Sequence, residues 1–165
     1  MPRAIFSLIV TLFAVLATPA LAQDVQINFG QSLRLDGSAL EVTADSLEVD
    51  QTSGATVFSG NVLAVQGGMR ITADQLTLEY VAGPTEGTRR IGQLLASGNV
   101  TMVTEREAIE AQQAVYSMTN QSLEMSGDVV LVQGSSLLSG QRFVADLRTG
   151  SGRMIGRVRT IISMD

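Results

Sequence analysis

The sequence contains no cysteine, no histidine, no tryptophan and no lysine. Without cysteine no disulfide can hold the fold, which must therefore depend on its hydrophobic core. Without histidine the chain lacks the commonest zinc ligand and the commonest general base. Catalysis would need a pair of carboxylates or a serine with an unusual base. The sequence therefore predicts neither an enzyme nor a metal or cofactor site.

Aromatic residues and cations are also scarce. Aromatic side chains make up 4% of the chain, too few to suggest stacking platforms for sugars or single-stranded bases. All 11 cations are arginines and they face 16 acidic residues, so the net charge is −5. An acidic chain is a poor nucleic-acid partner, because binding phosphates needs a basic surface. The many aliphatic residues suit flexible hydrocarbon ligands better than flat rings.

The first 22 residues have the pattern of a cleavable signal peptide. Arg3 precedes an apolar run, Ala4–Leu16, that is too short to span a bilayer, and small residues follow up to Ala22. We predict cleavage after Ala22 and export to the periplasm, with residues 23–165 forming a single domain. The competing interpretation is an uncleaved membrane anchor.

The remainder of the chain is a repeat. One motif opens each unit, and a second motif with a central glycine follows it. The glycine comes 18 residues after the opener in three units and 27 in the other, and the next opener always comes 11 residues later. The period is therefore 29 residues with one insertion of nine, near Gly83–Thr88. The openers start at Val42, Ile71, Ile109 and Leu138, and the glycine motifs start at Ser59, Ser97, Ser126 and, more weakly, Ile155.

Each unit alternates apolar and polar residues with the period of a β-strand. In the first unit Leu40, Val42 and Ala44 are apolar, and the pattern then shifts by one residue to Leu47 and Val49. The shift recurs in every unit and predicts a bulge or sharp bend where it occurs. The expected fold is all-β, an antiparallel β-jellyroll made of repeated bent hairpins, with no helix in the mature chain. The expected bends lie at Asp45–Ser46, Asp74–Gln75, Gln112–Gln113 and Gln141–Arg142.

Polar residues at repeated positions have a structural interpretation. Asp45 and Asp74 fall at the expected bends, where an aspartate accepts backbone hydrogen bonds and tolerates unusual dihedrals. Asn61, Asn99 and Asp128 each follow a glycine, where the ladder is expected to bulge. A calcium site is disfavoured, because the spacing supplies one carboxylate per strand.

Two charge clusters remain, Arg89-Arg90 and Glu105-Arg106-Glu107. They could contact the phosphates or sugars of a lipid headgroup, or they could form solvated loop faces.

The openers of the form Val/Ile-Thr-Ala-Asp, the repeated Ser-Gly-Asn-Val and the signal peptide resemble the OstA-like (LptA) family of periplasmic lipopolysaccharide-transport proteins. The resemblance covers about Leu40 to Met154. It implies a jellyroll that carries the acyl chains of lipopolysaccharide in a hydrophobic groove and bridges the inner and outer membranes during outer-membrane assembly. It also implies stacking against related jellyrolls of an inner-membrane-anchored partner and an outer-membrane translocon, with head-to-tail copies of the chain itself possible.

The lipid-binding groove is expected to be lined by the apolar face of the repeat. Val25–Phe29 and Val158–Ile162 are expected to be the edge strands through which partners join. The alternatives are a structural or adhesive β-repeat protein with a filled core and no lipid, and a membrane-anchored relative from the same family. The expected groove residues are Leu40, Val42, Phe58, Val62, Ile71, Leu76, Leu78, Tyr80, Val100, Met102, Tyr116, Met118, Met125, Val129, Leu131 and Phe143.

Overall fold

The computed structural model describes residues 25–28 and 38–162. The predicted signal peptide and its cleavage site lie outside these residues. Strands are the only regular structure in the described part of the chain, so the all-β prediction is confirmed. No helix that could cross a membrane occurs in this part of the chain. The strands are β1 (Val25–Asn28), β2 (Glu41–Thr43), β3 (Ser46–Val49), β4 (Thr56–Gln66), β5 (Met69–Ala82), β6 (Arg89–Val103), β7 (Glu107–Ser117), β8 (Ser122–Gln133), β9 (Ser136–Asp146), β10 (Ser151–Ile155) and β11 (Arg159–Ile162).

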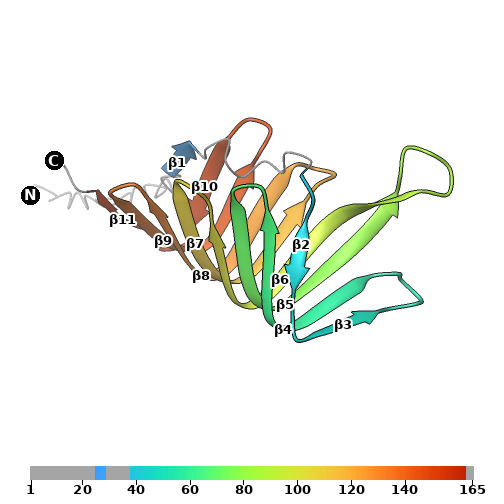
Figure 1. Cartoon of the computed structure of the whole chain (residues 1–165). Coiled ribbons are helices and arrows are strands. Elements are labelled where there is room, and N and C mark those ends of the chain that lie inside the picture. Colours follow the sequence, from blue (N-terminus) through green and yellow to red (C-terminus); the bar gives the residue numbers. More distant parts are fainter. Residues whose placement is uncertain (1–24, 29–37, 163–165) are drawn as a thin grey trace, which may run out of the picture.

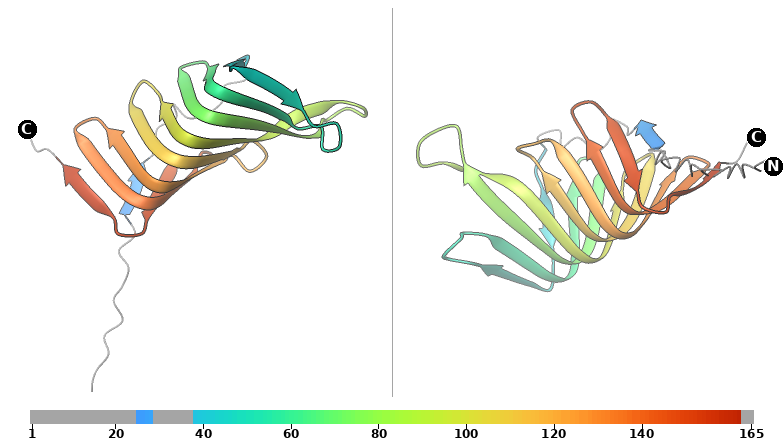
Figure 2. Two further views of the ribbon diagram at one scale, coloured as in Figure 1. Left: turned by 90° about the horizontal axis from the view of Figure 1, so that it is seen from below. Right: turned by 180° about the vertical axis from the view of Figure 1, so that it is seen from behind.

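All of these strands belong to one antiparallel sheet that is folded over on itself (Figures 1 and 2). The long strands β4 to β9 bend near their middle, so each contributes one half to each of two layers. β2 pairs with one half of β4 and β3 pairs with its other half. At the opposite end β11 pairs with one half of β9 and β10 with its other half, and β1 pairs with β10. The result is a roll of stacked bent hairpins with the apolar faces turned inward.

Apolar side chains run in unbroken cross-strand rows along the inside of each layer. Because directly paired residues share a face of the sheet, the strand register fixes these rows. Most of their members are at most 6% exposed, and they form one continuous core. This core replaces the disulfides that the chain cannot form. One row is Val42, Ala64, Ile71, Met102, Ile109, Leu131 and Leu138, and the other is Leu47, Phe58, Leu76, Ala96, Ala114, Met125, Phe143 and Met154.

Each bend lies where the opener strand was predicted to bend. The extra residue of the bulge, however, is in the paired strand that carries the glycine motif. Ser59 pairs with Gln75 and Val62 with Ala73, so Gly60 and Asn61 lie opposite Asp74 alone. Gly60 and Asn61 have φ values of 82° and 46°, a left-handed conformation that glycine and asparagine adopt at the lowest cost. The parity shift predicted a bulge or bend in the opener strand, and the repeated polar residues predicted a bulge after each glycine; the second prediction is confirmed. The register shift itself is absorbed by the glycine motif.

The same geometry recurs in every unit. Positive φ occurs at Gly98 and Asn99, at Gly127 and Asp128, and at Gly156 and Arg157. The weak fourth copy of the motif therefore bends its chain as the other three do, although arginine occupies the second position.

The nine-residue insertion lengthens a single hairpin. β5 and β6 extend beyond their neighbours and are joined by residues 83–88 (Figure 1). The Gly83 N–H donates to the Thr88 carbonyl at 2.8 Å, and the Thr88 hydroxyl donates to the Thr85 carbonyl at 2.6 Å. The loop predicted from the turn residues is thus an ordered hairpin end beside β3 and β4.

Both predicted edge segments are terminal strands of the sheet, and they lie at the same end of the roll. β1 pairs with β10 and β11 pairs with β9, so both are terminal strands at the C-terminal end. The opposite end is formed by β2 and β3. The alternation of apolar and polar residues identified both segments as strands. It could not show which strands they pair with, because pairing over long sequence separations is set by tertiary structure. Phe29, the last residue of the predicted N-terminal edge, lies outside the described residues.

Candidate functional site

All sixteen predicted groove residues belong to the interior of the roll. Eleven are buried members of the core and five are partly buried residues that pack against it. The buried residues are Val62, Ile71, Leu76, Leu78, Val100, Met102, Tyr116, Met125, Val129, Leu131 and Phe143. The partly buried residues are Leu40, Val42, Phe58, Tyr80 and Met118.

The middle of the roll is filled by these side chains. Leu76, Met125, Val129 and Phe143 are each 0% exposed, which is typical of a packed core. Hydrocarbon ligands could lie in this region only if side chains moved or the two layers separated.

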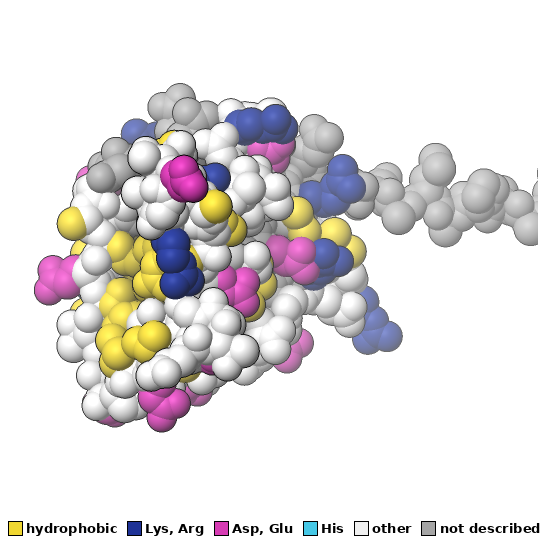
Figure 3. Space-filling model, turned by 90° about the vertical axis from the view of Figure 1, so that its right-hand side faces the viewer, with side chains coloured by type: hydrophobic (Ala, Val, Ile, Leu, Met, Phe, Trp, Pro, Cys, Tyr) yellow, Lys and Arg dark blue, Asp and Glu magenta, His cyan; other side chains and the backbone are white. Residues whose placement is uncertain are grey.

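The interior becomes accessible at the end formed by β2 and β3. Leu47 and Val49 pair with Phe58 and Thr56 in the rows that face inward, yet they are 56% and 57% exposed. No further strand of the described chain covers them. Figure 3, which views this end, shows hydrophobic side chains gathered in a hollow with a cationic side chain lying across it. We call this end of the roll, where Val42, Leu47, Val49 and Phe58 face inward, the open end.

The predicted groove set omitted Leu47 and Val49. The signal for them was present, because they continue the apolar face after the parity shift. Their exposure could not be predicted, since it depends on the absence of a covering strand at this end.

One arginine spans the open end. The guanidinium carbon of Arg89 lies 5.0 Å from the centre of the Tyr80 ring, a cation–π distance. Its Nη2 donates to the carbonyl of Gly54, in the turn between β3 and β4, at 3.4 Å. The Tyr80 hydroxyl is 3.3 Å from the hydroxyl of Thr56. The long β5–β6 hairpin is thereby connected to the β3–β4 hairpin across the opening.

The repeated aspartates stabilise the bends, as predicted, but their partners differ from the prediction. The Asn61 amide donates to Asp45 at 2.7 Å, and the Asn99 amide donates to Asp74 at 2.9 Å. The donors are asparagine side chains instead of backbone N–H groups, because the left-handed bulge turns each asparagine toward the neighbouring opener. These pairs are structural ties on the outside of the roll.

The cluster Glu105-Arg106-Glu107 divides into exposed and buried parts. Glu107 is 4% exposed, so the expectation of a solvated or headgroup-binding face does not hold for it. Its carboxylate accepts hydrogen bonds from the Thr104 hydroxyl at 2.6 Å and from the Gln133 amide at 3.3 Å. The Thr104 hydroxyl also accepts from the Glu107 N–H at 3.1 Å. Glu107 closes the β6–β7 turn and ties it to β8.

Ion pairs in the described part of the chain lie on the surface. Arg142 pairs with Glu124 at 2.7 Å, and Arg148 pairs with Asp146 at 3.0 Å. Hydrogen bonding to these carboxylates raises the pKa of each arginine. The Arg148 guanidinium lowers the pKa of Asp146.

In the β3–β4 turn, backbone N–H groups of Ser53 and Thr52 lower the pKa of Asp50. The described residues contain no group of three or more His, Cys, Asp or Glu side chains placed to hold a metal ion.

Formal charge is distributed unevenly along the roll. Residues 38–66, at the open end, contain four acidic residues and no arginine, a net charge of −4. Residues 79–90 of the β5–β6 hairpin, which reaches across this end, add two glutamates and two arginines and leave the net charge unchanged. Residues 136–162, at the opposite end, contain five arginines and one aspartate, a net charge of +4. The roll therefore has an acidic and a basic end.

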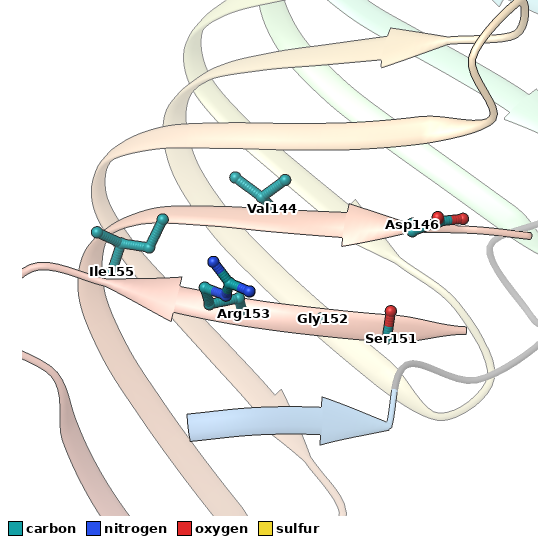
Figure 4. A pocket seen from close by; sticks show the side chains of 6 residues that line it. All are labelled: Val144, Asp146, Ser151, Gly152, Arg153 and Ile155. Atoms are coloured by element: carbon teal, nitrogen blue, oxygen red, sulfur yellow. The ribbon is translucent and has the colours of Figure 1, made fainter. Parts of the chain in front are cut away.

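A pocket of about 280 Å³ lies on the outer face of β9 and β10 (Figure 4). None of its lining residues belongs to the predicted groove set. It is lined by Val144, Asp146, Ser151, Gly152, Arg153 and Ile155. This pocket is separate from the apolar interior.

Residues 41–151 match the family described as LptA/(LptD N-terminal domain) LPS transport protein. The crystal structure of LptH, the LptA homologous periplasmic component of the lipopolysaccharide transport device from Pseudomonas aeruginosa, superimposes with a TM-score of 0.67. The match covers 77% of this chain and 96% of LptH at 16% identity, which shows a shared fold.

Two curated relatives also match. An uncharacterized protein of Rhizobium meliloti (strain 1021) is 27% identical over 146 residues, which cover 86% of this chain and 78% of that protein. The translocation and assembly module subunit TamB of Haemophilus influenzae is 25% identical over 168 residues, which cover 86% of this chain and 13% of TamB.

Proposed function

Because this chain belongs to the LptA/(LptD N-terminal domain) family of LPS transport proteins, we propose that it is a periplasmic protein that carries the acyl chains of lipopolysaccharide between the two membranes. Both the family and the fold are those of a transport protein. We further propose that the acyl chains bind in the apolar interior of the roll, which they enter from the open end.

The observation that carries this proposal is the exposure of inward-facing aliphatic side chains at the open end. Leu47 and Val49 extend the buried rows of the core to the surface. Transferring a hydrocarbon chain from water onto such a surface is worth about 0.8 kcal/mol per buried methylene. Acyl chains that follow the rows inward would displace contacts between the two layers.

Photo-crosslinking tests this proposal. A photoreactive residue at Val42 or Leu47, both of which face inward, is expected to form lipopolysaccharide adducts in the cell envelope. The neighbouring positions Thr43 and Glu48 are on the opposite face of the same strands, so they serve as matched controls and should give none. Adducts are detected by immunoblotting for lipopolysaccharide.

The alternative function is a structural or adhesive repeat protein without a lipid ligand. The observation that favours it is the packed middle of the roll, where Phe143 and Leu76 are fully buried. Absence of adducts at Val42 and Leu47 in folded protein would support this alternative. Equal amounts of adduct at the inward and outward positions would indicate non-specific contact with lipid. That result would also contradict a lipid-binding groove inside the roll.

We further propose that copies of the chain stack end to end and form part of the bridge. Both ends of the roll leave strand edges without a partner in the described sheet, β2 and β3 at one end and β1 and β11 at the other. Such edges can accept a strand from another chain. The acidic and basic ends favour head-to-tail contact, because head-to-head contact would bring like charges together. Related domains of inner- and outer-membrane partners would join at the same edges.

Charge reversal at the basic end is expected to abolish self-association. Sedimentation velocity should show assemblies of the wild-type protein that dissociate at high salt, because salt screens exposed charges beyond about 8–10 Å. The double variant Arg157→Glu/Arg159→Glu should remain monomeric. Mixing it with Glu41→Arg/Glu48→Arg protein should restore association between the two variants.

The control variant is Arg106→Glu, which adds negative charge at the β6–β7 turn, away from both ends of the roll. It should associate like the wild-type protein. A wild-type protein that is monomeric at every salt concentration would contradict the proposed stacking.

A further inference from the structure

Arg89 lies on the interior side of the open end. It pairs with Ala82, two residues beyond Tyr80 in β5, so the two side chains share the inward face of the sheet. Its guanidinium carbon is 5.0 Å from the Tyr80 ring centre, and Tyr80 packs against the core. A positive charge is thus held where the apolar interior meets solvent.

The bonding of Arg89 leaves its guanidinium available to an anion. Its hydrogen bond to the Gly54 carbonyl is long, at 3.4 Å, and uses one of five N–H donors. The ion pairs within the described residues are Arg142–Glu124 and Arg148–Asp146, and neither involves Arg89. Tyr80 and Gly54 therefore hold the side chain in place without neutralising it.

The carboxylates of β2 and β3 lie on the other face of the sheet, and the Asp50 carboxylate in the β3–β4 turn accepts hydrogen bonds from the Thr52 and Ser53 N–H groups. Glu41 pairs with Val65 and Glu48 with Val57, positions that alternate with the inward rows. The neighbouring Arg90 pairs with Val81 and also lies on the outer face. An anion reaching the inner rim of the opening would therefore meet Arg89, with the exposed apolar side chains of Leu47 and Val49 at the same end.

We propose that Arg89 binds the phosphate group of an anionic amphiphile whose acyl chains lie against Leu47 and Val49. This inference rests on the proposed lipid-carrying function and assigns the headgroup contact of that site. A planar guanidinium can donate two parallel hydrogen bonds to phosphate oxygens, which an apolar opening alone cannot supply. The opening would then select amphiphiles by headgroup as well as by chain.

The test compares lipopolysaccharide with the same preparation after a phosphatase has removed its phosphate monoesters. Binding is measured by surface plasmon resonance on wild-type protein and on the variants Arg89→Ala and Arg90→Ala. These variants make the same charge change on adjacent residues that face opposite sides. Both side chains are exposed, so thermal unfolding should show that both variants fold normally.

Arg89→Ala is expected to weaken binding of phosphorylated lipopolysaccharide about tenfold, the usual scale for a charge-assisted contact. Its effect on the dephosphorylated lipid, and the effect of Arg90→Ala on either lipid, should be less than about twofold. A molar excess of inorganic phosphate should not displace the lipid, because inorganic phosphate cannot make the apolar contacts of the acyl chains.

Two failures are distinguishable. Wild-type protein that binds neither lipid would overturn the proposed function. Wild-type protein that binds both lipids equally, with Arg89→Ala unchanged, would overturn the role of Arg89 and leave the lipid-carrying function standing. Displacement by inorganic phosphate with loss of discrimination between the lipids would indicate a site for the free ion, which contradicts an amphiphile site.

Discussion

Replacing Phe143 with alanine is expected to destabilise the protein by about 3–5 kcal/mol, the usual range for a buried aromatic side chain. Phe143 is 0% exposed and pairs with Met125 on one side and Met154 on the other. Removing the ring leaves a cavity in the interior row. The cavity cannot close easily, because hydrogen-bonded strands on both sides hold the backbone in place. Because the chain has no disulfide, nothing covalent offsets the loss.

The measurement is chemical denaturation followed by circular dichroism, with Val144→Ala as the control. Val144 is the next residue in β9 and faces the outside, where it lines the surface pocket. Its truncation should cost less than about 1 kcal/mol, as for a partly exposed aliphatic side chain. Similar losses for the two variants would show that the interior is not the packed core that the structure describes.

Substituting Gly98 with alanine is expected to cost about 2–4 kcal/mol, the sum of left-handed backbone strain and a steric clash. Gly98 has φ +76°, and an added Cβ would collide with the Asp74 carboxylate and lie 2.9 Å from its Cβ. Asp74 cannot withdraw freely, because it accepts a hydrogen bond from Asn99 at 2.9 Å. The substitution therefore strains the bend that connects the two layers.

Gly87 provides a matched control for backbone strain. Its φ is +77°, yet nothing lies within 4 Å of an added Cβ. Gly87→Ala should therefore cost about 1–2 kcal/mol from strain alone. Adding Asp74→Ala to Gly98→Ala should recover part of the larger loss, which a double-mutant cycle measures as coupling. Equal destabilisation by the two glycine substitutions, with no coupling to Asp74, would show that close packing at the bend is unimportant.

The Gly98 prediction concerns a contact that recurs in every unit of the repeat. Each bend combines a glycine that accepts left-handed φ with a side chain from the adjacent opener lying over it. Added Cβ atoms at Gly60, Gly98, Gly127 and Gly156 would meet Asp45, Asp74, Gln112 and Gln141, respectively. The opener and glycine motifs are therefore two halves of one contact, which explains why both recur at fixed spacing.

The sequence alone determined the fold class, the repeat, the turns and the inward face. Alternation depends on local strand geometry, so it identified the sixteen interior residues directly. Absence of cysteine and histidine excluded the usual metal sites and general bases without any structure. The Val/Ile-Thr-Ala-Asp openers, the repeated Ser-Gly-Asn-Val and the predicted signal peptide together indicated the family.

Tertiary structure decided which strands form the ends and which interior residues reach solvent. β1 joins β10 across more than 120 residues, a pairing that alternation cannot specify. Leu47 and Phe143 lie in the same interior row, yet one is 56% exposed and the other 0%. Periodicity reports which face of a strand is apolar, whereas exposure depends on whether another strand covers that face. Likewise, the sequence shows two adjacent arginines, and only the register places Arg89 at the open end and Arg90 outside.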